Sequence, residues 1–585
     1  MRRLDPQPLK ETILGQGPTQ EQQDAIFAGE LEFLLKACPG SGKTWTTCRR
    51  FLWRVANWSA SAGGLAMLSF TNAAVKEFKQ ATAEIGRGAL HEPHFVGTLD
   101  SFIERFVMGP FGHLITDGKK RPKVFLRPRP GDLKNSKLSV NVKTATGWMP
   151  VHAWQIQPRL AEGKVGFYAR PHFQDMKLDN NDALAAMSEL FRRGEYSQNQ
   201  RAFWADHLLW KFPSIAKTIA RRFPEVIVDE AQDTGLWLLQ FLRQLRDAGS
   251  KITLVGDPDQ CIYEFGQASV TTLAKCKKDW NLVERPLNKS FRCNDVIAAA
   301  VRQISGNLRF EGCGAVRSEL EGAYVFADTT EGFVAALEAF KKRAAAIGLE
   351  NSDCAILCRA HEQMVKMRGV VRYKALQGKT KRLAEAAFMR DGLGDLAGAM
   401  RETVEVLSEI CGEDLLWAKI EENPASELAM NVKTSVWRFV RSNEGLPSVA
   451  ATGAEWLPRL RTSIGALLKE LGIANIPNLA VQLRKTGITD TQLPLFSPEQ
   501  VFPELRFDTI HKAKGESIGG VLFVGGKKFF DQLAKDVSDG AETEDKRLGY
   551  VAMTRAQHLL CVATPAAHFV NYSGFWKERG FKQLG

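Results

Sequence analysis

The sequence lacks several features that would assign it to a common class of protein. Its ten cysteines include no pair of CxxC motifs, which argues against a zinc ribbon or an iron–sulfur cluster. The N-terminal segment has no apolar run of the kind found in signal peptides, and no apolar stretch approaches the roughly 20 residues that span a bilayer. We therefore expect a cytoplasmic protein in a reducing compartment that does not bind a membrane.

The chain has an ordinary globular composition, with 585 residues of which 44% are hydrophobic and 25% charged. A chain of this length corresponds to about three to five domains of roughly 100–200 residues. The formal net charge is +12 at pH 7. A basic balance is typical of proteins that bind nucleic acid, but it also occurs as general solubility charge, so composition alone does not decide between them.

A phosphate-binding loop lies near the N-terminus. The loop, Cys38-Pro-Gly-Ser-Gly-Lys-Thr44, follows a short apolar strand predicted over residues 32–37 and precedes a helix predicted over residues 45–56. Gly40 and Gly42 allow backbone N–H groups to turn toward phosphate oxygens, and the helix N-terminus adds the positive end of its dipole. The flanking strand and helix argue against a chance match.

The side chains of this loop predict ATP binding. We expect Lys43 to reach the β- and γ-phosphates and the Thr44 hydroxyl to bind Mg²⁺. The loop residues predicted to bind ATP are Gly40, Ser41, Gly42, Lys43 and Thr44.

An acidic segment completes the predicted ATP site. Val226-Ile-Val-Asp-Glu-Ala-Gln-Asp233 reads as an apolar strand that ends in carboxylates. Beside the loop, Asp229 would complete the Mg²⁺ coordination, and Glu230 would orient and deprotonate the attacking water. Such a pair is usually only a solvated strand end. Together with a phosphate loop it indicates ATP hydrolysis rather than nucleotide binding alone.

The order of motifs resembles the UvrD/Rep/PcrA branch of superfamily 1 helicases. Eight segments match the motifs of that family in register, over nearly the whole chain. They are residues 18–26 (Q motif), 69–74 (motif Ia), 97–102 (Ib), 229–233 (II), 255–263 (III), 287–292 (IV), 509–515 (V) and 547–556 (VI). One such match would be weak, but eight in the same order are specific.

The resemblance implies roles for further residues of the ATP site. Gln22 matches the glutamine that reads adenine, and Phe291 matches the aromatic residue that stacks on it. Arg292 and Arg555 match two arginines that reach the γ-phosphate from the second lobe, where a guanidinium can fork onto phosphate oxygens. Gln260 matches the glutamine that links the γ-phosphate to the DNA track. The predicted catalytic residues are Lys43, Asp229, Glu230, Gln260, Arg292 and Arg555.

The resemblance also implies a track for single-stranded DNA and travel in the 3′→5′ direction. Aromatic side chains can grip any base, because every base has a π-face worth roughly 1–3 kcal/mol per stack. Phe70, Tyr263 and Phe265 match family positions that stack on or line the bases. The family positions near the phosphate backbone are matched by Thr71, Thr98 and His511.

Three departures from the family pattern support an alternative. Gly266 stands where the family usually has arginine, and Asp100 stands where the best-known members have histidine. Lys514-Gly-Glu-Ser517 resembles a side branch of UvrD-like proteins that includes members found beside nucleases in phage-defence loci. The alternative is a DNA-activated ATPase sensor subunit of an antiviral defence complex with a nuclease partner.

Two further alternatives stay open. The first is a binding module with a vestigial motor, against which the intact catalytic residues argue. The second is an RNA helicase, because DNA is favoured by the family resemblance only.

The predicted fold is α/β, with two RecA-like P-loop domains and an insertion in each. The first lobe comprises residues 1–108 and 201–285, with a basic β-rich insertion at 109–200; the second comprises 286–371 and 501–585, with a helical insertion at 372–500. Residues 383–410 and 455–471 carry apolar residues at helical spacing. We expect the helical insertion to serve in regulation or duplex contact.

The β-rich insertion carries most of the excess charge. Four strands are predicted within it, over residues 123–127, 138–142, 151–156 and 164–168. Between Lys119 and Phe173 there are twelve Lys or Arg and two Asp or Glu residues, a local charge of +10. Trp148, Trp154, Phe167 and Tyr168 interleave with this charge. The pattern favours contact with duplex or single-stranded DNA, with a partner-protein surface and a merely solvated face as alternatives.

Overall fold

The computed structural model contains two compact units, which are described separately. Unit 1 comprises Met1–Arg317 and Gln532–His558, and unit 2 comprises Ser318–Asp531 and Leu559–Gly585. The structure describes residues 5–59, 63–85, 92–125, 132, 135–144, 147–161, 164–169, 176–262, 270–306, 309–329, 333–359, 378–393, 396–411, 427–473, 478–484 and 505–584. Unit 1 includes stretches that the sequence assigns to the second lobe. The predicted lobe and insertion boundaries stay a prediction.

Unit 1 is built on a six-stranded parallel sheet in the order β13-β1-β12-β11-β2-β3. The strands are β1 (Phe33–Ala37), β2 (Leu65–Ser69), β3 (Phe95–Thr98), β11 (Glu225–Val228), β12 (Lys251–Gly256) and β13 (Val283–Leu287). In a parallel sheet all strands end at one edge, which is where such folds bind ligands. The segments that follow β1, β11 and β12 therefore meet at this edge.

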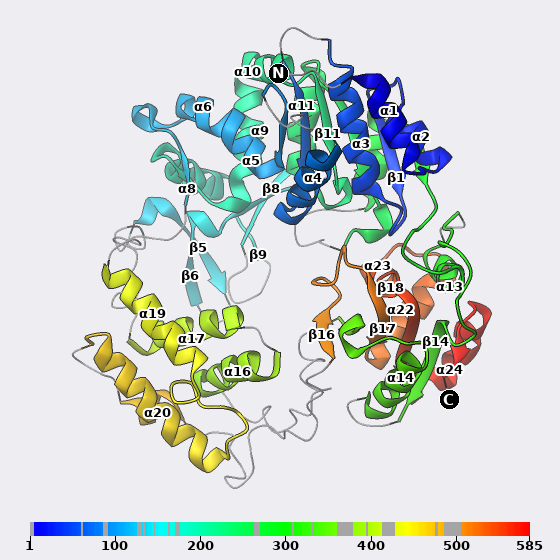
Figure 1. Cartoon of the computed structure of the whole chain (residues 1–585). Helices are drawn as coiled ribbons and strands as arrows, with labels where there is room; N and C mark the ends of the chain where they lie inside the picture. Colours follow the sequence, from blue (N-terminus) through cyan, green and yellow to red (C-terminus); the bar gives the residue numbers. More distant parts are fainter. Residues whose placement is uncertain are drawn as a thin grey trace. The chain divides into compact units, whose positions relative to one another are not determined.

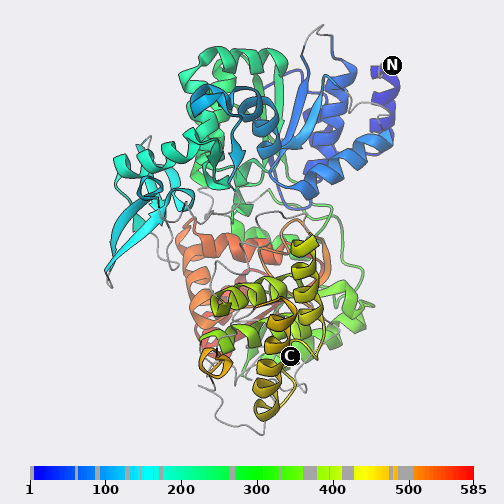
Figure 2. The same ribbon diagram turned by 90° about the vertical axis from the view of Figure 1, so that its left-hand side faces the viewer.

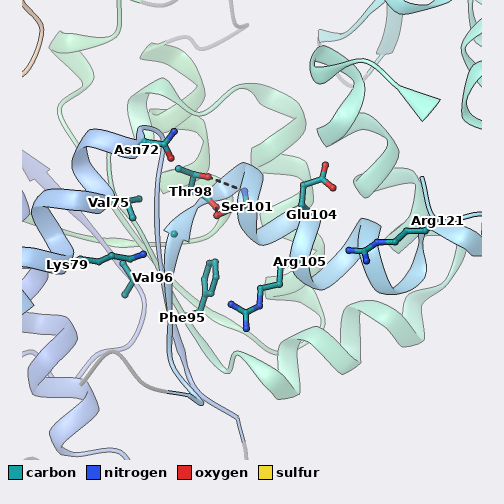
Figure 3. Close-up of a pocket in the computed structure, with 11 residues that line it drawn as sticks. Asn72, Val75, Lys79, Phe95, Val96, Thr98, Ser101, Glu104, Arg105 and Arg121 are labelled. Carbon is teal, nitrogen blue, oxygen red and sulfur yellow. Dashed lines mark hydrogen bonds between the residues drawn. The ribbon is translucent and has the colours of Figure 1, made fainter. Parts of the chain in front are cut away.

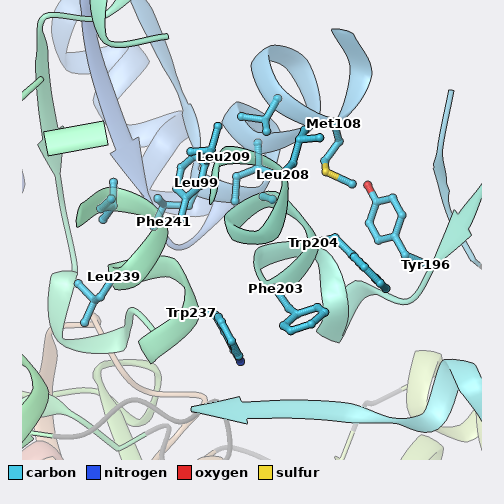
Figure 4. Packing of buried hydrophobic residues seen from close by; sticks show 14 of the residues in the cluster. Leu99, Met108, Tyr196, Phe203, Trp204, Leu208, Leu209, Trp237, Leu239 and Phe241 are labelled. Atoms are coloured by element: carbon cyan, nitrogen blue, oxygen red, sulfur yellow. The ribbon is translucent and has the colours of Figure 1, made fainter. Parts of the chain in front are cut away.

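Helices cover both faces of this sheet (Figure 1). Those on one face are α1 (Pro6–Gly15), α2 (Gln20–Ile26), α3 (Lys43–Ala56) and α4 (Asn72–Ile85); those on the other are α5 (Leu99–Ile103), α9 (Arg201–Lys211), α10 (Pro213–Arg222) and α11 (Leu236–Asp247). Successive strand residues point to opposite faces. Phe33 and Leu35 accordingly pack with the first set of helices, whereas Leu34 packs with the second. Figure 4 shows part of the second core.

Unit 1 contains further helices besides those on the two faces of its sheet. They are the π-helix η1 (Glu104–Met108), α6 (Gly109–Phe111), α8 (Asn180–Arg192), α12 (Val270–Asp279), α13 (Asp295–Ser305), α23 (Glu544–Met553) and the last part of α22 (Lys527–Asp539). Short 3₁₀ turns lie at Gly112–Ile115, Asp117–Lys119, Ser136–Leu138, Ala153–Gln155, Gln198–Gln200, Ala231–Asp233 and Pro258–Gln260.

The basic segment of unit 1 is rich in short strands. They are β4 (Lys123–Val124), β5 (Ser139–Thr144), β6 (Gly147–His152), β7 (Gln157–Ala161), β8 (Lys164–Ala169), β9 (Met176–Lys177) and β10 (Glu195–Tyr196). Antiparallel pairing joins β5 to β6 and β7 to β8 and β9, and β10 pairs with β4 in parallel. The β5–β6 ribbon, in cyan, projects from the rest of unit 1 (Figure 1 and Figure 2).

Two details of this segment differ from the sequence expectation. The strand predicted over residues 151–156 is wrong beyond His152, because the next three residues form a 3₁₀ turn that His152 and Gln155 cap reciprocally. Phe167 is a core residue rather than a surface one, at 3% exposure. Trp148 is exposed, at 72%, and Trp154 stacks between the rings of Phe125 and His152.

Unit 2 contains a second parallel sheet, in the order β16-β15-β17-β18-β14-β19. The strands are β14 (Gly322–Asp328), β15 (Cys354–Cys358), β16 (Arg506–Thr509), β17 (Ile518–Val524), β18 (Ala556–Pro565, whose first three residues belong to unit 1) and β19 (Lys582–Gln583). Helix α14 (Val334–Ala346) packs on this sheet, and α24 (Ala566–Glu578) follows β18. All described pairings within it are parallel. Two parallel sheets give the chain the predicted mixed α/β fold.

Unit 2 also holds a helical segment with its own core. Its helices are α16 (Gly378–Leu393), α17 (Leu396–Cys411), α19 (Glu427–Arg441), α20 (Gly453–Glu470) and α21 (Leu479–Gln482). The fully buried Trp456 lies in this core, where its indole N–H donates to the Pro447 carbonyl. Helices α16 and α17 lie over most of residues 383–410, and α20 lies over most of residues 455–471; the role of this segment as an insertion stays a prediction. Within the part of the chain that the structure describes, no helix has both the length and the apolar character to cross a membrane.

Packing around α9 offers a test of the core formed with α5, α10 and α11. Leu208 is fully buried in it (Figure 4), whereas Trp210 on the same helix is 70% exposed. Leu208→Ala should lower the free energy of unfolding by about 2–5 kcal/mol, because it leaves a cavity. Trp210→Ala, the matched control, should change it by about 0.5 kcal/mol or less. Urea unfolding followed by circular dichroism measures both; equal losses would contradict this packing.

Candidate active site

The phosphate loop joins the end of β1 to the start of α3. Gly40 and Gly42 have φ values of 73° and 75°, in the left-handed region that favours glycine. At Gly40 there is also no room for a side chain. A Cβ there would lie 2.5 Å from Arg292 Cβ and 2.7 Å from Ser290 Oγ. The residues after β13 therefore pack directly on the loop.

Backbone hydrogen bonds fix this contact. The Cys38 N–H donates to the Leu287 carbonyl at 2.9 Å, and the Phe291 N–H donates to the Gly40 carbonyl at 2.7 Å. The Phe291 side chain is 49% exposed beside the loop. An exposed aromatic ring held at a phosphate loop can stack on a nucleotide base.

Gln22 packs against the loop from the other side. It lies on α2, where it forms a reciprocal cap with Thr19, and its side chain is buried. Its Nε2 donates to the Ser41 carbonyl at 3.1 Å. The predicted role of Gln22 in reading adenine stays a prediction, but the residue does contact the loop.

Lys43 forms an ion pair with the acidic segment after β11. Its Nζ lies 2.9 Å from Glu230 Oε2. Burial acts to lower the pKa of Lys43, but the carboxylates of Glu230, Asp229 and Asp257 outweigh it and raise that pKa. Lys43 therefore stays charged. A phosphate bound in the loop would compete with Glu230 for the ammonium group.

Asp229 is almost completely buried beside this pair. Burial and the adjacent Glu230 raise its pKa to about 7, and Lys43 opposes the rise. A divalent cation favours the ionised carboxylate that burial disfavours. Thr44 lies half-buried in the first turn of α3, so its hydroxyl and the Asp229 carboxylate have the oxygen chemistry that Mg²⁺ requires.

Glu230 adopts an uncommon backbone conformation. Its φ is 54°, one of the few positive values at a non-glycine residue in the described chain. Such strain persists only where the surrounding structure enforces it, and it concentrates at functional sites. Here it turns the carboxylate toward Lys43.

A continuous chain of hydrogen bonds leads from Glu230 to Arg555. Gln232 Nε2 donates to Glu230 Oε2, and Gln232 Oε1 accepts from the Asp257 N–H at 3.0 Å. Asp257 Oδ2 accepts from Gln260 Nε2 at 2.6 Å, and Gln260 Oε1 accepts from Arg555 Nη2 at 3.2 Å. The chain joins motifs II, III and VI within unit 1.

The two arginines lie together in the same buried region. Arg555 is fully buried, and burial together with Arg292 lowers its pKa to about 9. Burial also lowers the pKa of Arg292, whose Nη1 donates to the Thr554 carbonyl at 3.3 Å. Neighbouring buried cations repel each other, so an added anion such as a γ-phosphate would be stabilising here.

Three residues of this site had no role in the sequence prediction. Gln232 and Asp257 carry the middle of the hydrogen-bond chain, and Arg547 Nε donates to the Cys261 carbonyl at 2.6 Å. Each lies inside a segment that matches a family motif, and this location is the sequence signal that could have identified it as a site residue.

A pocket between α4 and α5 forms a second candidate site, for nucleic acid. This α4–α5 pocket has a volume of about 670 Å³. It is lined by Asn72, Val75, Lys79, Phe95, Val96, Gly97, Thr98, Ser101, Glu104, Arg105 and Arg121 (Figure 3). In this view the Phe95 ring lies between Lys79 and Arg105. Three cations around an aromatic floor can bind phosphate and base.

The predicted DNA-track residues fall in different places. Thr98 lines the α4–α5 pocket and caps α5 by accepting from the Ser101 N–H at 3.1 Å. Phe70 is 41% exposed, and Thr71 accepts from the Ala74 N–H at 3.2 Å at the start of α4. His511 follows β16 in unit 2, so the structure does not relate it to these residues. Tyr263, Phe265 and Gly266 lie outside the described residues.

Comparisons with known proteins agree on one family. Residues 18–126 and 132–281 match the model of the UvrD/REP helicase N-terminal domain. DNA helicase II of Haemophilus influenzae is 22% identical over 94% of this chain and 84% of its own length. DNA helicase II of Escherichia coli is 22% identical over 92% and 83%. ATP-dependent DNA helicase PcrA of Bacillus subtilis is 23% identical over 49% and 39%. These matches do not favour the alternative of a defence sensor with a nuclease partner.

The close approach at Gly40 gives a test of the loop. Gly40→Ala should weaken ATP binding by about tenfold or more, because the new Cβ must displace Arg292 or the loop. Gly15→Ala is the matched control, since a Cβ added at Gly15 would meet no atom within 4 Å and its φ is not positive. Titration with a fluorescent ATP analogue measures both. Unchanged binding by Gly40→Ala would refute the tight loop.

Proposed function

Since this chain is UvrD/Rep/PcrA-like, with a UvrD/REP helicase N-terminal domain over residues 18–126 and 132–281, we propose that it is an ATP-dependent DNA helicase. It moves 3′→5′ along single-stranded DNA. The observation that carries the proposal is the buried hydrogen-bond chain from Glu230 to Arg555 beside the phosphate loop.

ATP binds with its phosphates on the loop and its base near Phe291 and Gln22. Thr44 and Asp229 would hold Mg²⁺, which would supply positive charge to offset that of the phosphates. Mg²⁺ is usually bound by one or two carboxylates together with substrate phosphates. Such a site needs no larger cluster, and among the described residues no group of three or more His, Cys, Asp and Glu side chains could hold a metal ion.

Lys43 and Glu230 exchange partners when the nucleotide enters. Lys43 leaves Glu230 for the phosphate oxygens, and the freed carboxylate then accepts a proton from the attacking water. Arg292 and Arg555 stabilise the charge that develops on the γ-phosphate. Gln260 accepts a hydrogen bond from Arg555 and donates one to Asp257. A movement of Arg555 toward the γ-phosphate therefore alters the contacts of Asp257 and of the segment that follows β12.

DNA binds through its phosphates at the α4–α5 pocket. Lys79, Arg105 and Arg121 supply the positive charge, and Thr98 and Ser101 supply hydroxyl groups. Phe70 lies exposed just before α4 and stacks on a base. The β5–β6 ribbon, with Trp148 exposed on it, contacts the duplex ahead of the single strand.

Mutations can separate the two parts of this proposal, ATP hydrolysis and the binding of single-stranded DNA. Lys43→Ala and Glu230→Gln should each lower the ATP turnover number by about 100-fold or more, because they remove phosphate binding and the general base. Both should bind single-stranded DNA within about twofold of the wild type, since neither lines the α4–α5 pocket.

Lys251→Ala is the control for loss of a lysine ion pair. Lys251 lies 3.3 Å from Glu32 at the surface, so its removal should leave turnover unchanged. A loss of DNA binding in Lys43→Ala or Glu230→Gln would argue against separate sites.

Strand displacement tests the activity and its direction. We expect single-stranded DNA to stimulate ATP hydrolysis and a partial duplex with a 3′ tail to be unwound, while a 5′-tailed duplex is not. A gel assay of labelled-strand release measures both substrates. Hydrolysis without displacement would favour a DNA-activated sensor, and stronger stimulation by RNA would favour an RNA helicase.

A further inference from the structure

Two carboxylates stand beside the proposed DNA site, where they would oppose phosphate binding. Asp100 lies on α5, and Glu104 begins η1, which continues the same helix. Glu104 lines the α4–α5 pocket, and the Asp100 side chain is 49% exposed. Residues four apart share one side of a helix, so the two negative charges add at that wall.

One arginine pairs with both carboxylates. Arg201 Nη1 lies 2.5 Å from Asp100 Oδ2, and its Nε donates to Glu104 Oε1 at 2.9 Å. The Tyr196 hydroxyl donates to the same Glu104 oxygen. Burial acts to lower the pKa of Arg201, but Asp100 and Glu104 outweigh it and raise that pKa. The arginine therefore keeps its charge with a side chain only 10% exposed.

The two ion pairs, and not the helix that carries Arg201, favour a positive charge at this position. Arg201 is the first residue of α9, where the helix dipole opposes a positive charge. Its neighbour Gln200 is anchored, because Nε2 donates to the carbonyls of Ala153 at 2.7 Å and Ile156 at 2.9 Å. The connection between β6 and β7 thus holds the start of α9 against α5.

We propose that Arg201 is a positioning residue for DNA, which offsets part of the negative charge of Asp100 and Glu104 and so keeps the wall of the α4–α5 pocket able to accept phosphate. The inference rests on the proposed function, because it assumes that DNA phosphates bind at this pocket. Arg201 itself does not line the pocket, so it acts through the two carboxylates.

The first variant removes the neutralising charge. Arg201→Gln should bind a fluorescein-labelled oligodeoxythymidylate about five- to tenfold more weakly at about 50 mM salt, measured by fluorescence anisotropy. The deficit should shrink at about 300 mM salt, because mobile ions then screen the carboxylates from the phosphates of the oligonucleotide. A deficit that is independent of salt would overturn the proposal.

A rescue separates neutralisation from other roles. Arg201→Gln combined with Asp100→Asn and Glu104→Gln should restore binding to within about twofold of the wild type, because no unpaired charge remains. If Arg201 contacted phosphate directly, or only held the fold together, the triple variant would stay as weak as Arg201→Gln. That result would refute the inference.

A second variant covers the case in which Arg201→Gln does not fold. Asp100→Asn with Glu104→Gln, and Arg201 intact, should bind the oligonucleotide several-fold more tightly than the wild type at low salt, because Arg201 is then uncompensated. Weaker binding would contradict the proposal.

Arg246→Gln is the matched control for the loss of a partly buried arginine pair. Arg246 lies 2.8 Å from Glu32 at the start of β1, and neither lines the pocket. Its DNA binding should equal that of the wild type. If the wild type itself fails to bind the oligonucleotide, the proposed function falls and this inference with it. If the wild type binds and Arg201→Gln binds equally well, only the inference falls.

Discussion

The balance of buried charge around the phosphate loop is the constraint on which the rest of the structure depends. Arg555 is fully buried, and the Lys43 side chain is only 11% exposed. Glu230 pairs with Lys43 and is joined to Arg555 by the hydrogen-bond chain, and the buried Asp229 precedes it. A buried charge without a partner is costly, so each must be paired or shifted in pKa. Glu230 pairs with Lys43, while the pKa of Asp229 rises and that of Arg555 falls. A phosphate anion and a divalent cation would relieve both shifts together.

The same balance explains why segments distant in sequence must meet. The hydrogen bond between Arg555 and Gln260 joins residues 295 positions apart. It continues through Asp257 to the acidic segment after β11, because β11 and β12 are adjacent parallel strands that end at one edge. Contiguous polar contacts therefore join Arg555 to the segments after β11 and β12. Such a connection is one physical means by which hydrolysis can be coupled to a nucleic-acid track.

Local patterns in the sequence predicted the parts of this site that are themselves local. Glycines between an apolar strand and a helix predicted the position of the phosphate loop. Carboxylates directly after a strand predicted that Asp229 and Glu230 lie beside that loop. The roles of Gln232 and Asp257 depend on strand register, which a single sequence does not contain. The strand predicted over residues 151–156 failed because the cap formed by His152 and Gln155 outweighs β-propensity there. The sequence identified Asp100 only as a departure from the family pattern. Its ion pair with Arg201 was not predicted, because the fold brings these two distant residues together.

Burial also decides which arginines an anionic ligand could reach. Arg105 lines the α4–α5 pocket and is paired with Glu92 at 3.2 Å, but the two side chains are 59% and 78% exposed. An exposed pair is worth about 0–1 kcal/mol, so a phosphate can replace Glu92. In the pair between Arg201 and Glu104 the side chains are less exposed, at 10% and 35%, so these partners exchange less readily. The charge that an anionic ligand would meet is therefore set by how deeply each ion pair is buried, and a net charge of +12 does not predict it.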